Sequence, residues 1–106
     1  MRRRRSRFRE LCQLQLDLFA SDQAELLAEI ADAERAWADA GRDEAEEAYG
    51  DYQLAVDAAA DVLLDIRESY AATLAEDQAR DYRAAFNDAA TRRFRRLSTL
   101  LADLDT

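Results

Sequence analysis

Residues 45–70 read AEEAYGDYQLAVDAAADVLLDIRESY and carry an apolar side chain at every third or fourth position. These apolar positions are Ala45, Tyr49, Tyr52, Val56, Ala59, Leu63, Ile66 and Tyr70. Because an α-helix turns once in about 3.6 residues, the spacing places all of them on one face. The stretch therefore predicts a long amphipathic helix that packs along a single seam.

The same spacing occurs nearer the N-terminus. It runs through Cys12, Leu16, Phe19, Gln23, Leu26, Ile30, Ala33, Trp37 and Ala40. Only Gln23 is polar in this series, and Phe8 extends the series backwards. A third, looser stripe consists of Ala79, Tyr82, Phe86, Ala89, Ala90, Leu97, Leu100, Leu101 and Leu104. Arg93 interrupts this last stripe, and we expect its side chain to need either a carboxylate neighbour or room to extend its charged end into solvent.

Helix ends are predicted from capping residues, since the chain has no proline. Gly41 has the position of a glycine with positive φ after a helix end, and Asp43 and Glu46 have the spacing of a capping box. Thr73 and Glu76 repeat that spacing just where the seam is lost. We therefore predict a second break, between Tyr70 and Leu74.

These signals predict an all-α fold, an elongated up-down-up three-helix bundle with antiparallel, coiled-coil-like packing. The helices are expected at about 7–39, 43–71 and 74–104, after a basic N-terminal arm at residues 1–6. Composition agrees, because 23 Ala and 14 Leu favour helices and four Ile and Val cannot populate a sheet. An alternative places a further helix start at Ser21–Asp22, inside the first helix.

Composition also excludes several classes of function. The chain has no His and one cysteine, Cys12, so it lacks Ser–His and Cys–His nucleophiles and mixed Cys/His zinc sites. We expect no catalytic, cofactor-binding or metal-binding residues and no enzymatic activity. Cys12 is expected to be a small buried hydrophobic residue. No transmembrane segment or targeting signal is predicted, which favours a cytoplasmic location.

Two arginine clusters are candidate binding elements. The first, the arginine arm, gives residues 1–9 a charge of +6, against −14 for the other 97 residues. Its members are Arg2, Arg3, Arg4, Arg5, Arg7 and Arg9. The arm could bind an acidic protein, nucleic-acid phosphate or an anionic membrane, or serve only solubility. The second cluster, Arg92, Arg93, Arg95 and Arg96, complements the dipole at a helix C-terminus.

Several large apolar side chains fall off the seams. Leu14 and Leu18 lie off the seam of the first predicted helix. Leu54 and Leu64 lie off the seam of the second helix, and Phe94 off that of the third. One bundle core cannot cover all of these residues, so we expect a second apolar surface. Leu14 and Leu18 are therefore candidate partner-binding residues.

Two further features have ordinary explanations. Trp37 is expected in the core, with a role as a partner anchor as the alternative. The row Asp57, Asp61, Asp65 and Glu68 is expected to be a solvated helix face.

Taken together, the sequence predicts a non-catalytic, homodimeric helical protein for protein–protein interaction or assembly. The alternative is a nucleic-acid-associated protein that docks its arginine arm on phosphates.

Overall fold

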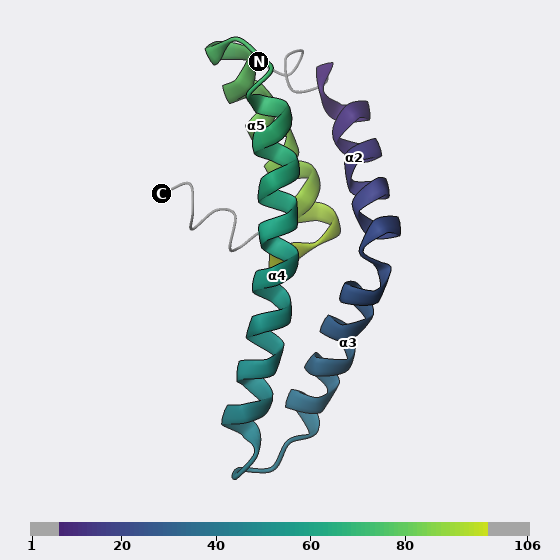
Figure 1. Cartoon of the computed structure of the whole chain (residues 1–106), viewed down its shortest axis with the longest axis vertical. Coiled ribbons are helices and arrows are strands. Elements are labelled where there is room, and N and C mark those ends of the chain that lie inside the picture. Colours follow the sequence, from purple (N-terminus) through teal and green to yellow (C-terminus); the bar gives the residue numbers. More distant parts are fainter. Residues whose placement is uncertain (1–6, 98–106) are drawn as a thin grey trace.

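The computed structural model describes residues 7–97, and this part of the chain is all-α, without strands. Its helices are α2 (Arg9–Asp22), α3 (Ala24–Asp39), α4 (Ala45–Ala71) and α5 (Glu76–Arg93). The molecule is elongated, with extents of 50 × 28 × 22 Å (Figure 1). The predicted arm at residues 1–6 and the predicted helical residues 98–104 lie outside the described range.

The break between α4 and α5 falls where the lost seam predicted it. α4 ends at Ala71 and α5 begins at Glu76. Thr73 does not cap α5, as the predicted capping box required. Its hydroxyl instead donates a 2.7 Å hydrogen bond back to the Tyr70 carbonyl, and no side chain caps the N-terminus of α5. Thr73 thus gives a hydrogen-bond donor to a carbonyl at the end of α4 and does not bond to the free N–H groups at the start of α5.

The single helix predicted for residues 7–39 is wrong, because the structure divides it into α2 and α3. The division is at Gln23, with φ −110° and ψ 28°, next to the alternative boundary at Ser21–Asp22. The hydrogen-bond ladder nevertheless continues, from the Gln23 N–H to the Phe19 carbonyl and from the Leu27 N–H to the Gln23 carbonyl. The division is therefore a bend, and it leaves the apolar stripe on one side.

The third predicted helix is interrupted at Phe94, and residues 95–97 are helical again beyond it. α5 ends at Arg93, and Phe94 leaves the helical region with φ −132° and ψ 64°. This turn lets the Phe94 ring pack edge-to-face on Phe19, with 5.3 Å between ring centroids, and Leu97 follows into the core. Burial of these apolar side chains explains why the helix stops inside a sequence of good helix formers.

The loop between α3 and α4 also differs from its prediction. Gly41 has no positive φ. Ala40 ends α3 in an extended conformation, with φ −67° and ψ 138°, so the chain leaves the helix without a left-handed residue. The expected Asp43–Glu46 capping box is absent too, because α4 starts after Glu44 without a side-chain cap.

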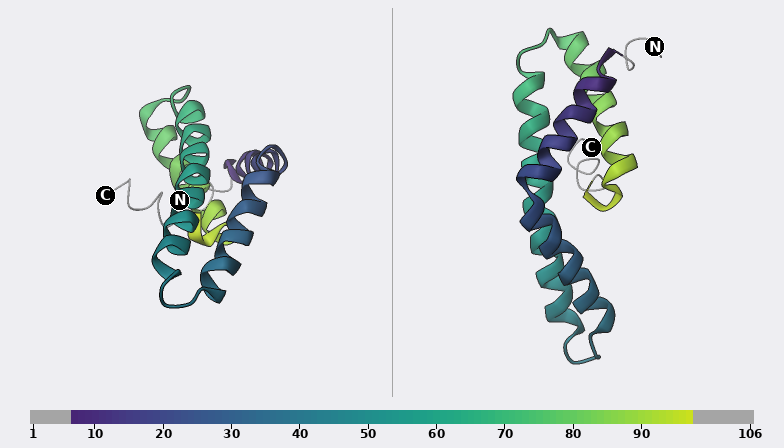
Figure 2. Two further views of the ribbon diagram at one scale, coloured as in Figure 1. Left: turned by 60° about the horizontal axis from the view of Figure 1, so that its bottom comes forward. Right: turned by 90° about the vertical axis from the view of Figure 1, so that its right-hand side faces the viewer.

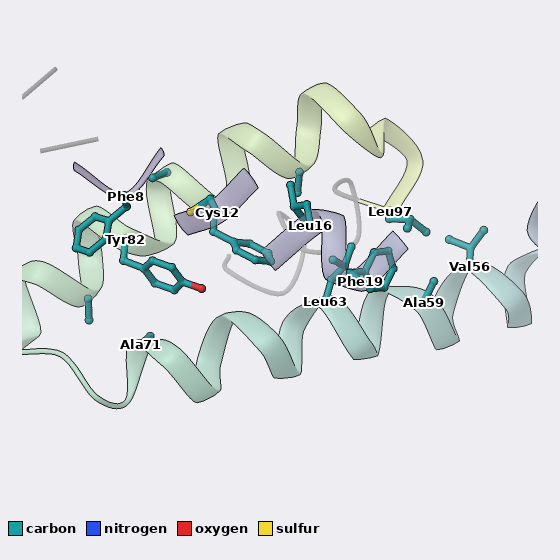
Figure 3. Close-up of a cluster of buried hydrophobic side chains, with 14 of the residues drawn as sticks. Phe8, Cys12, Leu16, Phe19, Val56, Ala59, Leu63, Ala71, Tyr82 and Leu97 are labelled. Atoms are coloured by element: carbon teal, nitrogen blue, oxygen red, sulfur yellow. The ribbon is translucent and has the colours of Figure 1, made fainter. Parts of the chain in front are cut away.

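The core lies where α2, α5 and the second half of α4 meet, as Figure 3 shows. Its largest fully buried side chains are Tyr82, Phe19, Phe86, Leu16, Leu63 and Cys12. No residue of α3 is buried to this degree. Past the end of α5, α3 and the first half of α4 continue as a two-helix hairpin (Figure 2). The predicted bundle of three long helices is therefore not confirmed, although the all-α class is.

Among residues 7–97, no helix is both long enough and apolar enough to cross a membrane.

Candidate interaction surfaces

The structure exposes both leucines that the sequence selected. Leu14 and Leu18 lie one turn apart on α2, with 56% and 54% of their surface accessible. Leu11, on the same side of α2, is half-buried against the core. We call Leu11, Leu14 and Leu18 the leucine stripe. Side chains at this spacing form one continuous strip on a helix.

The other residues predicted off the seams have different surroundings. Leu54 is 71% exposed on the outer side of α4, beside the acidic residues Asp51 and Asp57 in the sequence. Leu64 and Phe94 are partly buried against the core. Among these residues that lie off the seams, only Leu14 and Leu18 are exposed leucines next to each other on one helix.

Three aromatic rings gather at the end of the hairpin next to the loop that joins α3 and α4. Trp37 of α3 packs edge-to-face on Tyr49 of α4, with ring centroids 4.8 Å apart, and stacks on Tyr52 at 5.5 Å. Tyr52 is buried, and this burial raises the pKa of its hydroxyl, as does the nearby Tyr49. Trp37 and Tyr49 remain 40% and 45% exposed. The prediction that Trp37 lies in the core is therefore wrong, because its ring packs on Tyr49 and Tyr52 at the end of the hairpin and partly faces solvent. Its role as a partner anchor stays a prediction.

A hydrogen-bonded row continues from this cluster along α4. The Tyr49 hydroxyl donates to Gln53 Oε1 at 3.1 Å, and Gln53 Nε2 donates to Asp57 Oδ1 at 3.0 Å. Each pair is separated by one helical turn, so the row runs parallel to the helix axis. Its aromatic and polar groups have fixed positions on a regular helix.

The hairpin is strongly acidic. Residues 24–57 contain eleven Asp and Glu against two Arg, a net charge of −9. One of the arginines, Arg35, pairs with Asp32 on α3. The negative charge of the hairpin attracts cations and disfavours contact with other acidic surfaces.

The predicted carboxylate row on α4 is only partly a free face. Asp57, Asp61 and Asp65 are exposed, as expected. Glu68 instead accepts two hydrogen bonds from Arg83 of α5, at 2.8 and 2.9 Å, and one from Arg67 at 2.9 Å. These bonds, chiefly those from Arg83, lower the pKa of the Glu68 carboxyl. Glu68 is a structural contact between α4 and α5.

Arg67 is a charged core residue that the sequence patterns did not reveal. Its side chain is only 3% exposed, and Nη1 donates to Asn87 Oδ1 at 3.0 Å. The sequence did indicate this position, because Arg67 follows the seam residue Ile66 and lies one turn after Leu63 on the same side of α4.

The second basic cluster acts mainly within the fold. Arg93 pairs with Asp17 of α2, which is the carboxylate neighbour that the sequence predicted for it. Its guanidinium also lies 5.4 Å from the Phe94 ring centroid. Arg96 pairs with Glu34 of α3. These ion pairs attach the end of α5 to α2 and α3; Arg92 and Arg95 are exposed beside them.

The arginine arm is only partly inside the described range. Arg7 and Arg9 are exposed at the start of α2, whereas Arg2, Arg3, Arg4 and Arg5 lie outside. Arg7 and Phe8 line a small pocket of about 110 Å³ with Asp77, Gln78 and Asp81 of α5. Two acidic residues of α5 therefore line the same pocket as Arg7, near the C-terminal end of the arm.

The structure gives no geometry for nucleophilic chemistry at Cys12. Its side chain is fully buried, and this burial raises the pKa of its thiol to about 11. Within residues 7–97, no group of three His, Cys, Asp or Glu side chains is placed to hold a metal ion.

Comparison with known proteins adds no relative from which a function could be transferred: no family model matches the chain, and no curated protein or solved structure matches it significantly.

Proposed function

We propose that this chain is a non-catalytic helical protein for protein–protein interaction or assembly, and that it forms a homodimer through the leucine stripe. One observation carries this proposal: Leu14 and Leu18 are both more than half exposed and lie one turn apart. An apolar strip of this kind is typical of helix-to-helix binding surfaces. A cytoplasmic location remains a prediction from the sequence.

The free energy expected from burying the leucine stripe in a dimer is large enough to measure. Burying a whole leucine side chain stabilises a complex by roughly 1.5–3 kcal/mol, so covering the exposed half contributes about 1 kcal/mol. A symmetric dimer uses the stripe twice, and its four exposed leucines then contribute about 4 kcal/mol. Losing that amount weakens association by about 1000-fold.

Light scattering of the full chain tests the proposal. At micromolar concentration and high salt, which screens contacts between charged surfaces, the wild type is expected at about twice its chain mass of 12.1 kDa. The variant Leu14→Glu/Leu18→Glu is expected at the monomer mass. Leu54→Glu is the matched control, because Leu54 is more exposed but isolated, and it is expected to remain dimeric. A monomeric wild type, or equal effects of the two variants, would contradict the proposal.

Phosphate binding by the arginine arm is the second candidate. It is favoured by six Arg without an acid in residues 1–9 and by the exposure of Arg7 and Arg9. The acidic hairpin would repel a duplex, so a duplex could approach only from the arm's end. Retention on a nucleic-acid column that falls steeply with salt, and is lost in Arg2–Arg5→Gln, would support this function. Retention at about 150 mM salt that is unchanged in that variant would contradict it.

A further inference from the structure

We propose that the hairpin of one copy binds the arginine arm of a second copy, so that chains associate head to tail. The binding surface would be one edge of the hairpin, formed by Trp37, Glu46, Tyr49, Gln53 and Asp57; we call it the hairpin edge. This inference is independent of the leucine stripe and concerns a different surface.

The hairpin edge continues the surface of α4 on which α5 packs. Asp57 precedes Glu68 by 11 residues, and Glu46 precedes Asp57 by 11, which is about three helical turns in each case. All three residues therefore lie along one edge of α4. Glu68 binds Arg83 of α5, but α5 ends at Arg93, and the described residues after it are paired with α3 through Arg96 and Glu34. Of the residues that the structure describes, only α3 and α4 form this end of the molecule (Figure 1).

The chemistry of the edge fits an arginine-rich segment. Glu46 and Asp57 are exposed carboxylates. The half-exposed Tyr49 lies about one turn from Glu46 and two turns from Asp57 on α4, and Trp37 packs on it. Guanidinium groups pair with carboxylates in a planar fork and also stack on aromatic faces, so arginine uses both kinds of group at once. Trp and Tyr are also the residues that most often dominate binding energies at interfaces.

Charge favours the arm over two other occupants. The hairpin carries −9 and residues 1–9 carry +6, whereas a second hairpin would bring another −9. Residues 98–106 are a further candidate from this chain, but they contain two Asp and no Arg. Opposite charges accelerate and stabilise association, and like charges oppose it.

The arm of the same copy cannot reach Trp37, at the far end of the hairpin edge. Phe8 and Trp37 lie at opposite ends of the α2–α3 rod, which at 1.5 Å per residue is about 43 Å long between them. The six residues before Arg7 span at most about 20 Å when fully extended. Asp77 and Asp81 beside Arg7 can neutralise part of the arm locally, but six arginines exceed these two acids. The contact proposed here therefore joins two chains.

Trp37 is the chain's one tryptophan, so its fluorescence reports directly on the proposed site. The probe is a synthetic peptide of residues 1–9, which contains no tryptophan, added to the full-length Arg2–Arg5→Gln variant. We expect a saturable change in Trp37 emission. With Glu46→Arg/Asp57→Arg added to the protein, the affinity is expected to fall by at least about tenfold.

The matched control is Glu47→Arg/Asp51→Arg, which makes the same charge change on the side of α4 away from α5. We expect it to lower the peptide affinity by less than about threefold. Equal losses in the two variants would show non-specific attraction and overturn the proposal. So would the absence of a saturable change, whether the edge is covered by residues 98–106 or the arm binds its own α5. Far-ultraviolet circular dichroism verifies that each variant is helical.

A mixing experiment tests the contact between whole chains. Sedimentation of Arg2–Arg5→Gln mixed with Glu46→Arg/Asp57→Arg leaves one intact arm and one intact hairpin edge in the mixture. We expect a new 1:1 complex that neither variant forms alone and that dissociates with added salt. A mixture that sediments as the sum of its components would contradict head-to-tail association. Both variants also carry Leu14→Glu/Leu18→Glu, so association through the leucine stripe does not contribute to this result.

Discussion

Arg83 of α5 donates two parallel hydrogen bonds to the Glu68 carboxylate of α4, from Nε at 2.9 Å and from Nη2 at 2.8 Å. This two-pronged geometry fixes direction as well as distance, which a single bond between flexible side chains does not. Glu68 also accepts a bond from the buried Arg67, whose other partner is Asn87 of α5. These hydrogen bonds therefore fix the position of α5 along α4, close to the turn at residues 72–75.

Stability is expected to depend on pH through Glu68. The pKa of its carboxyl is lowered in the folded chain, first by the Arg83 hydrogen bonds. The contribution is therefore complete above the unfolded pKa of about 4.5 and is lost as pH falls through the folded value. Because the Glu68 side chain is 41% exposed, solvent screening keeps this contribution modest.

Urea denaturation at several pH values measures this effect. The free-energy difference between wild type and Glu68→Gln is expected to be largest at pH 7 and to shrink as pH drops below about 4.5. Asp61→Asn, which removes a carboxylate from the exposed row outside this network, controls for the loss of one charge. A difference that stays constant down to pH 3 would show that the ionised form of Glu68 does not stabilise the fold.

Replacement of Arg67 is expected to destabilise the junction of α4 and α5. Arg67→Ala removes a side chain that is 3% exposed and leaves Asn87 without this donor, at a cost of about 2–4 kcal/mol. Arg67→Met keeps most of the buried volume, and Glu68 keeps Arg83, so its cost is expected to be about half as large. The measurement is the free energy of unfolding in urea. Equal losses in the two variants would mean that the polar contacts, not packing, dominate at this position.

A smaller effect is expected at Tyr82, which ties α5 to α2. Its hydroxyl donates a 2.8 Å hydrogen bond to Gln15 Oε1, and burial raises its pKa. Tyr82→Phe keeps the ring in the core and is expected to cost about 1 kcal/mol. Tyr49→Phe removes an exposed hydroxyl that bonds to Gln53, and its cost is expected to be near zero. A negligible loss for Tyr82→Phe by chemical denaturation would show that water replaces the bond without penalty.

The predicted seams identified much of the core because helical spacing is a local property. Cys12, Leu16 and Phe19 are buried on α2, and Val56 and Leu63 on α4, as their spacing indicated. The α3 series from Leu26 to Trp37 is just as regular, yet it is covered only in part. Its burial depends on the length of α5, which ends where Phe94 turns toward Phe19. That contact joins residues far apart in the sequence, so no local pattern reveals it.

The candidate surfaces also differ in whether a local sequence pattern could predict them. Leu14 and Leu18 were found because a residue off a helical seam points away from it, whatever the neighbouring helix does. The acidic charge of the hairpin was also present in the composition. The hairpin edge was not foreseen, because it exists only where α5 fails to cover α4. The capping boxes failed for a related reason: Thr73 and Asp43 have alternative bonding or loop paths that depend on the whole fold.

The last prediction concerns Cys12, whose reactivity reports on opening of the core. Its thiol is fully buried, and this burial raises its pKa to about 11, so at pH 8 only about one thiol in a thousand is ionised. The thiolate is the reactive form, and a reagent must also reach it through the packed α2–α5 interface. Native protein is therefore expected to react with a disulfide reagent at least about 100-fold more slowly than protein in urea. As the chain has one cysteine, the released chromophore gives the modified fraction directly, and Cys12→Ser supplies the background. Complete modification within minutes under native conditions would show that α2 detaches readily from α5, contrary to the packing of Phe8 on Tyr82 with their ring centroids 5.6 Å apart.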